Sequence, residues 1–139
     1  MDYKLELVVL PVSDVDRAKA FYCDKMGFHL DVDHHPNEQF RVVQMTPPGS
    51  ACSITIGKGV TTAVPGSVRG LHLVVADIEA ARAELLQRGV DVSDIFHFGP
   101  DGQRPGPEPN RSDYNSFASF ADPDGNSWLL QEVNHPRAR

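Results

Sequence analysis

The sequence is poor in cysteine and in positive charge, and it lacks a long hydrophobic run. Its two cysteines, Cys23 and Cys52, show no spacing typical of a metal or redox motif, so we expect both to be reduced and buried. The net charge of −6, with no basic run, argues against nucleic acid and anionic membranes as partners. No apolar window of roughly 18 residues and no signal-peptide pattern are present. We therefore predict a cytoplasmic protein.

Motifs of common catalytic machinery are also missing. There is no Ser-His-Asp order, no phosphate-binding glycine loop and no CxxC pair. The length of 139 residues fits one compact domain, or two small modules that share a core, but not two independent domains.

A hairpin pattern near the end of the chain is the clearest local signal. Residues Phe117 to Glu132 read as a strand, a turn at Asp122-Pro123-Asp124-Gly125 and a second strand, with Asp122 and Asp124 shaping the turn. A weaker copy lies between Phe40 and Gly57, around a Thr-Pro-Pro-Gly turn. The chain therefore contains one hairpin twice.

The segments before each hairpin repeat as well. Val12, Asp14 and Val15 are matched by Val75, Asp77 and Ile78 at a constant shift in numbering, which indicates an internal repeat. Each copy predicts a strand, a capped helix that ends at a glycine, and a further strand. In the first copy these are Leu5–Val12, a helix from Ser13 to Gly27, Phe28–Val32 and a polar turn at Asp33-His34-His35-Pro36; in the second they are Leu71–Val75, a helix from Asp77 to Gly89 and Val90–Phe98.

The predicted fold is α+β, with eight strands in two tandem β-α-β-β-β modules within one domain, 1–139. Residues 1–57 form the first module, 58–68 a linker and 69–134 the second module. The second module carries an inserted loop, 99–110, with four prolines and three glycines, which predicts no regular structure. We expect this loop to be either a lid hinged near His97 and Tyr114 or a disordered surface loop, and the tail from Asn134 onward to be frayed.

The paired modules, with VSDVDRAKAFYCDKMGF near the start and DPDGNSWLLQE near the end, resemble the vicinal oxygen chelate superfamily. That group includes glyoxalases, extradiol dioxygenases, fosfomycin-resistance enzymes and bleomycin-resistance proteins. The resemblance implies that each mixed sheet curls around a cavity and that metal ligands come from the first and last strands of each module. It also implies modules that pair within or between chains.

The metal-ligand positions that the resemblance implies fall on Leu7, Ser53, Gly70 and Leu129. Divalent ions need imidazole, carboxylate or thiolate ligands, and these four residues offer none. We therefore predict no metal and no other cofactor. His34 and His35 beside Asp33 are an alternative metal cluster, although a solvated turn suits them better because no third ligand has suitable spacing.

Strand alternation adds a second set of residues to the same face as these positions. The pocket floor then contains Val9, Thr55, His72 and Gln131, a mixture suited to a largely apolar small molecule with a few polar groups. Thr55 and Gln131 could instead bond to each other, and His97 and Tyr114 could close over a ligand or anchor the loop. Glu132 should point to the opposite face, and Trp128 should pack under a helix or meet a partner subunit.

Two classes of function remain open on this reading. The first is a metal-free binding protein of the bleomycin-resistance type, which sequesters a largely apolar metabolite or an antibiotic and forms a homodimer. The second is a metal-independent enzyme of the lyase, isomerase or hydrolase type, acting on a small carbonyl, epoxide or natural-product intermediate. There His72 would be the catalytic acid or base, with Gln131 or Tyr114 positioning the substrate. An interaction module with a vestigial pocket is a third, less specific reading.

Overall fold

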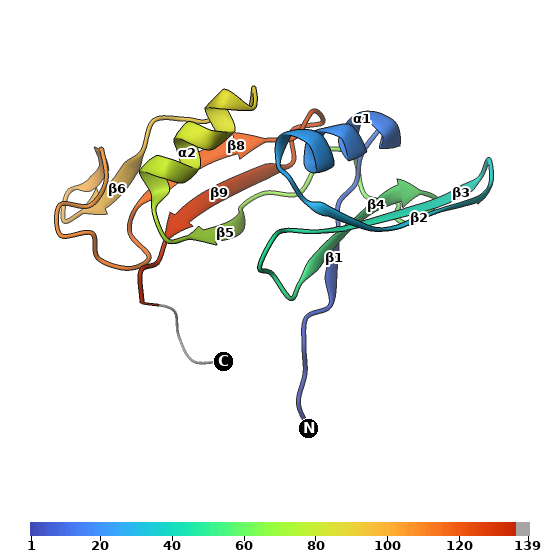
Figure 1. Cartoon of the computed structure of the whole chain (residues 1–139), viewed down its shortest axis with the longest axis horizontal. Coiled ribbons are helices and arrows are strands. Elements are labelled where there is room, and N and C mark those ends of the chain that lie inside the picture. The colour runs from blue at the N-terminus through green and yellow to red at the C-terminus, as the bar shows by residue number, and fades with distance from the viewer. Residues whose placement is uncertain (136–139) are drawn as a thin grey trace. The chain divides into compact units, whose positions relative to one another are not determined.

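The computed structural model describes residues 1–135 and divides the chain into two compact units. Unit 1 contains Met1–Val68 together with the turn Asp122–Asn126, and unit 2 contains Arg69–Ala121 and the chain from Ser127 onward. Each unit has one sheet and one α-helix longer than a single turn (Figure 1). Within residues 1–135, no helix is both long and apolar enough to span a membrane.

Unit 1 is built on a four-stranded mixed sheet. Its strands lie in the order β1-β4-β3-β2, with β1 parallel to β4 and the other pairs antiparallel. The elements are β1 (Leu7–Val9), α1 (Val15–Ala20), the π-helix η1 (Phe21–Lys25), β2 (His29–Asn37), β3 (Phe40–Thr46) and β4 (Ser53–Lys58).

Unit 2 repeats this plan on a five-stranded mixed sheet. Its order is β5-β9-β8-β6-β7, with β5 parallel to β9 and the other pairs antiparallel. The elements are β5 (Leu71–Val75), α2 (Ile78–Gln87), β6 (Phe96–Gly99), β7 (Gly102–Pro105), β8 (Phe117–Ala121) and β9 (Ser127–Glu132). The prediction of an α+β fold with two mixed sheets is confirmed, and neither sheet is closed.

The helix boundaries follow local capping chemistry, with one correction. Asp77 caps α2, as predicted, and its carboxylate accepts from the Ala80 backbone N–H at 3.1 Å. The prediction that Ser13 caps α1 is wrong: the cap is Asp14, which accepts from the Arg17 N–H at 3.0 Å. Ser13 instead donates its backbone N–H and its hydroxyl to Asp124, at 3.1 and 2.5 Å.

The predicted turn at residues 33–36 is also wrong, because these residues belong to β2. Asp33 accepts from Lys19 at 2.8 Å and from Arg41 at 3.0 and 3.1 Å, and Arg41 lies in the paired strand β3. These ion pairs and the β2–β3 ladder outweigh the local turn preference. Pro36 is tolerated because β2 is an edge strand with a register shift between His34 and Asn37.

The insertion holds regular structure that the sequence did not predict. Residues Gly102–Pro105 form β7, which pairs antiparallel with β6 through a two-residue turn at Pro100 and Asp101. The predicted strand Val90–Phe98 is reduced to Phe96–Gly99. Proline occurs in β7 because this strand lies at the sheet edge, where a missing N–H donor costs little. The described residues thus contain nine strands rather than eight.

The start of the tail is held in place. Asp113 accepts from the Asn134 backbone N–H at 2.7 Å and contacts Nδ1 of His135 at 3.1 Å. The rest of the tail for which fraying was predicted, residues 136–139, lies outside the described residues.

Each helix covers one face of its own sheet. In unit 1, α1 and η1 bury Ala18, Phe21 and Tyr22 on the face that carries a buried apolar set from β3 and β4: Val43, Met45, Ile54 and Ile56. In unit 2, α2 buries Ile78 and Leu85 on the face of Ala118, Phe120, Trp128 and Leu130. We call the opposite face of each sheet its open face.

The burial of Trp128 and of the two cysteines can be compared with the predictions. Trp128 packs in the core of unit 2, stacked on Phe120 with a ring-centroid distance of 6.1 Å. Cys23 and Cys52 are free, but they are half-buried rather than buried.

The turn between β8 and β9 is held by buried polar side chains of unit 1. The Tyr22 hydroxyl donates to Asp122 at 2.8 Å, and the other Asp122 oxygen accepts from the backbone N–H groups of Asp124 and Asn126 at 2.9 and 3.0 Å. The Asn126 amide donates to the Pro11 carbonyl and to Asp122, at 2.9 and 2.8 Å, and accepts from the Val68 N–H at 3.1 Å. The turn is therefore shaped by Asp122, as predicted, and is also bonded to distant parts of unit 1.

We expect Asn126→Ala to destabilise the protein by about 2–4 kcal/mol, because it removes three hydrogen bonds of a fully buried amide, to Pro11, Asp122 and Val68. Urea unfolding followed by circular dichroism measures this change. Asn110→Ala is the matched control, since Asn110 is exposed and its side chain bonds to no other described residue. A loss for Asn126→Ala no greater than for the control would contradict the structural role of this amide.

Candidate functional site

The predicted site residues of unit 1 share the open face of its sheet. Leu7 pairs with Ser53 and Val9 with Thr55 across the parallel strands β1 and β4. All four therefore point away from the face that α1 covers. Leu7 and Val9 are half-buried, whereas Ser53 and Thr55 are buried. Their role in binding a ligand stays a prediction.

This face also carries polar side chains that the sequence analysis did not select. Thr46 contacts a carboxylate oxygen of Asp31 and lies 2.6 Å from the Ser53 hydroxyl. Thr55 Oγ1, in contrast, is buried without a hydrogen-bond partner among the described residues. The alternative in which Thr55 bonds to Gln131 stays a prediction; within unit 2, the Gln131 amide donates to the Tyr114 carbonyl at 3.1 Å.

The predicted residues of unit 2 lie on its open face in the same manner. His72 pairs with Leu129, Gln131 lies two residues further along β9, and Gly70 comes directly before β5. His72 is exposed, and its Nδ1 lies 2.7 Å from the Gly70 carbonyl oxygen. With Nδ1–H donating to that carbonyl, Nε2 is left as an acceptor that faces solvent.

The open face of unit 2 also carries an aromatic cluster that was not predicted from the sequence. The rings of Phe96, Phe98 and Phe117 lie 5.6–5.9 Å apart, and Phe98 is 50% exposed. Phe117 pairs with Gln131, which places the cluster on the same face as the predicted residues. The alternation Phe-His-Phe at residues 96–98 could have indicated it, but the prolines that follow suggested an irregular loop.

A cavity of about 570 Å³ adjoins this cluster. Phe96, Pro105 and Ser119 line it, together with Gln103 and Arg104 of β7. Its volume lies in the range of pockets that hold small organic molecules. The cavity and the cluster share Phe96, and the rest of the cavity lining mixes apolar residues with polar and charged ones, Asp94 and Arg104 among them.

The loop that leads into β8 is fixed by backbone and side-chain bonds. His97 Nδ1 lies 2.7 Å from the Gly106 carbonyl, and the Tyr114 N–H donates to the Glu132 carbonyl at 2.9 Å. Arg111 and Tyr114 both have positive φ, 53° and 69°, which is uncommon for residues other than glycine. The role of the insertion as a lid stays a prediction.

A charged pair holds this strained loop. Arg111 donates to Glu132 from Nε at 2.8 Å and from Nη2 at 2.5 Å, and to Glu79 at 2.7 Å. Glu132 is only 1% exposed and also accepts from the Ile78 N–H at 3.1 Å. The Arg111 guanidinium holds the pKa of Glu132 below its ordinary value of 4.5. Glu132 is structural, as its position opposite Gln131 predicted.

The lowered pKa of Glu132 predicts the direction in which the stability of the protein changes with pH. A carboxylate with a depressed folded pKa stabilises the protein above its unfolded pKa, and this contribution is lost as the pH falls through the folded value. We expect Glu132→Gln to cost roughly 2 kcal/mol at pH 7, because the half-exposed Arg111 loses its buried partner. The two stability curves should approach each other below pH 4.5 and converge once the pH lies below the folded pKa of Glu132.

Urea unfolding between pH 2 and pH 7 tests this, with Glu38→Gln as the control because Glu38 is exposed. Parallel pH curves for the wild type and Glu132→Gln would contradict the assignment.

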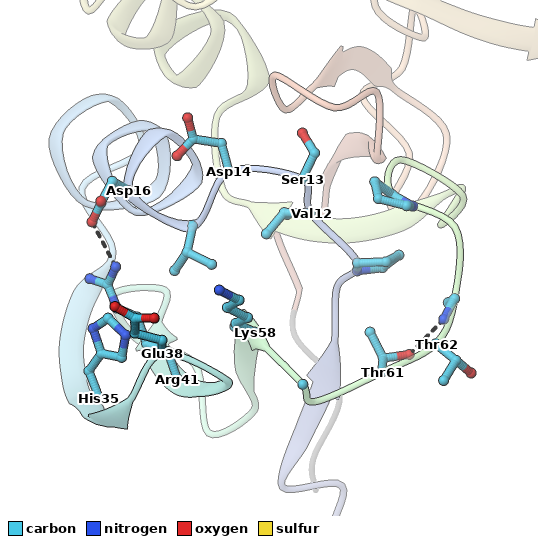
Figure 2. Close-up of a pocket in the computed structure, with 16 residues that line it drawn as sticks. Val12, Ser13, Asp14, Asp16, His35, Glu38, Arg41, Lys58, Thr61 and Thr62 are labelled. Atoms are coloured by element: carbon cyan, nitrogen blue, oxygen red, sulfur yellow. Dashed lines mark hydrogen bonds and ion pairs between the residues drawn. The ribbon is translucent and has the colours of Figure 1, made fainter.

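A second cavity, of about 810 Å³, lies in unit 1 and contains none of the predicted ligand-binding residues. It is lined by residues around the start of α1, the β2–β3 hairpin and the end of β4 with the following linker. Figure 2 shows Lys58 and Val12 at its centre and the ion pair between Arg41 and Asp16, 2.8 Å long, at one side. Its walls mix charged side chains such as Asp16, Arg41 and Lys58 with apolar ones, so an apolar molecule would have to desolvate the charged groups.

The described residues contain no group of three or more His, Cys, Asp or Glu side chains that could hold a metal ion. The alternative cluster of Asp33, His34 and His35 is therefore not supported. Arg41 and Lys19 donate hydrogen bonds to the carboxylate oxygens of Asp33, and these bonds hold the pKa of Asp33 well below its usual range.

Comparisons with known proteins agree with this architecture. The family model of the Glyoxalase/Bleomycin resistance protein/Dioxygenase superfamily matches residues 4–130, and the chain belongs to this superfamily. The crystal structure of TnmS3, an antibiotic-binding protein from Streptomyces sp. CB03234, is similar, with 34% identity over 94% of this chain and 96% of that one and a TM-score of 0.73.

Two further relatives extend the comparison. A glyoxalase/bleomycin resistance protein from the same Streptomyces strain is 35% identical over 92% of this chain and 99% of that chain, with a TM-score of 0.69. The uncharacterized protein YetH of Bacillus subtilis (strain 168) is 25% identical over 126 residues, which cover 90% of this chain and 94% of YetH.

Proposed function

We propose that the protein binds and sequesters a small, largely apolar aromatic molecule, such as an antibiotic or another natural product, without a metal ion. The observation that carries this proposal is the cluster of Phe96, Phe98 and Phe117 beside a cavity of about 570 Å³. Half-exposed aromatic rings next to a cavity are costly to leave in water, and they offer a face on which a flat ligand can stack.

The polar groups beside the cluster fit a binding role. Gln131 is held by the Tyr114 carbonyl, so its side chain is fixed before a ligand arrives. Ordered groups lose little entropy on binding, which favours affinity. The antibiotic-binding relative TnmS3, 34% identical over most of the chain, supports the same class of ligand. Catalysis by His72 stays a prediction: its Nδ1 lies 2.7 Å from the Gly70 carbonyl, and no acidic side chain bonds to the ring among the described residues.

We further propose that the chain is a homodimer. Several apolar side chains on the open faces are exposed, among them Val32, Val74 and Phe98. Apolar area of this kind is favourably buried against a second copy. Light scattering should give about twice the chain mass of 15.3 kDa, and a mass of one chain at micromolar concentration would contradict it.

Replacement of Phe98 tests the aromatic site. We expect Phe98→Ala to weaken binding of methyl 2-naphthoate at least fivefold, about 1 kcal/mol, because one ring of the stacking surface is lost. Isothermal titration calorimetry measures the affinity. Phe40→Ala is the control, since Phe40 is a partly exposed phenylalanine of unit 1. Equal weakening by both variants, or no saturable binding to the wild type, would overturn the proposal.

Metal independence has its own measurement. The positions Leu7, Ser53, Gly70 and Leu129 offer no imidazole, carboxylate or thiolate, so we expect far less than one divalent ion per chain by elemental analysis. Affinity for methyl 2-naphthoate should be unchanged by EDTA. A stoichiometric Zn, Ni, Mn or Fe that survives dialysis would contradict this expectation.

A further inference from the structure

The open face of the unit 1 sheet carries a short chain of hydrogen-bonded side chains. Asp31, at a register shift in β2, contacts the hydroxyl of Thr46, which lies 2.6 Å from the hydroxyl of Ser53. The three residues come from three neighbouring strands, β2, β3 and β4. Ser53 is the last residue of this hydrogen-bonded series and is buried.

Counting protons gives the direction of each bond. An ionised carboxylate only accepts, so the single proton of Thr46 goes to Asp31. Thr46 can then only accept from Ser53, which commits the proton of Ser53 as well. Ser53 Oγ is left with lone pairs and no proton to offer. Towards a ligand it is a hydrogen-bond acceptor.

Thr55 lies two residues further along β4 on the same face and has the opposite character. It is 5% exposed, and its Oγ1 is a buried side-chain polar atom that no other described residue satisfies. Buried polar groups without a partner are rare in native structures, because burial removes water without replacing it. Its proton is uncommitted, so Thr55 can donate to a ligand.

The spacing of the two hydroxyls selects the ligand group. Residues two apart in a strand are separated by roughly 6.6 Å. A single ligand oxygen spans at most about 5.6 Å with two hydrogen bonds of about 2.8 Å. An amide carries its donor N–H and its acceptor oxygen on two atoms that lie about 2 Å apart, a separation set by its C=O and C–N bonds. This extra length allows one amide to bond to both hydroxyls.

We propose that Ser53 and Thr55 form a recognition site for an amide-type group, in which Ser53 accepts from the ligand N–H and Thr55 donates to the ligand carbonyl. The inference rests on the proposed function, because it requires that the protein binds a small molecule. It assigns to the sheet of unit 1 a preference for amide groups among small-molecule ligands.

Gln44 pairs directly with Thr55 across β3 and β4, so its side chain lies beside Thr55 on the same face of the sheet. Gln44 is half-buried, and its amide bonds to no other described residue. Its side chain can therefore move without breaking a hydrogen bond within residues 1–135. A ligand amide would take the place that this side chain vacates beside Thr55.

The test compares two probes that differ only in this group, 2-naphthamide and methyl 2-naphthoate. We expect the wild type to bind the amide at least tenfold more tightly in calorimetric titrations. Thr55→Val and Ser53→Ala should each reduce the preference to twofold or less. Thr62→Val is the matched control, since Thr62 is exposed and forms no hydrogen bond with another described residue, and it should keep the tenfold preference.

A stability measurement separates recognition from a structural role. Thr55→Val removes an unsatisfied hydroxyl and keeps the shape of the side chain, so the melting temperature without ligand should stay the same or rise. A lower melting temperature would mean that the hydroxyl is structural and would overturn the inference. Equal binding of both probes by the wild type overturns it while the proposed function stands. Failure of both probes to bind overturns the two together.

Discussion

The constraint on which the rest of this structure depends is that each sheet has only one helix to cover it. Helices α1 and α2 bury one face of their sheets, with Met45 and Ile56 beneath the first and Trp128 and Leu130 beneath the second. A sheet has two faces, and the hydrophobic effect can hide only the one that finds a partner. The other face must be tolerated in water or used, and the candidate binding residues of β1, β4, β5 and β9 lie on these open faces.

The two open faces have different chemistry, although the modules repeat one plan. In unit 1 the open face carries a carboxylate and two hydroxyls bonded in series: Asp31 contacts Thr46, and Thr46 contacts Ser53. In unit 2 it carries the cluster of Phe96, Phe98 and Phe117. A repeat of the fold therefore does not make a repeat of the site. One face offers directional hydrogen bonds, and the other offers a stacking surface for flat rings.

Strand alternation predicted which residues share a face, because the side-chain period of a strand is fixed at two. Leu7, Val9, Ser53 and Thr55 fall together for that reason. The turn assigned to Asp33 and Pro36 failed because Lys19 and Arg41, distant in sequence, hold Asp33 within a strand. The phenylalanine cluster was missed because it needs β6 to pair with β8 across the insertion, and no local pattern specifies that pairing.

The sequence by itself determined the α+β class and the two-module repeat, because both follow from patterns of residue type along the chain. It also determined the cap at Asp77 and the glycines that end the helices, because these depend on neighbours within a few residues. Only the tertiary structure decided which polar groups find partners. Tyr22 meets Asp122 and Arg111 meets Glu132 through chain segments far apart in sequence, while Thr55 meets none among the described residues. Hydrogen bonds act over about 3 Å, so their pairing depends on where the folded chain brings each atom.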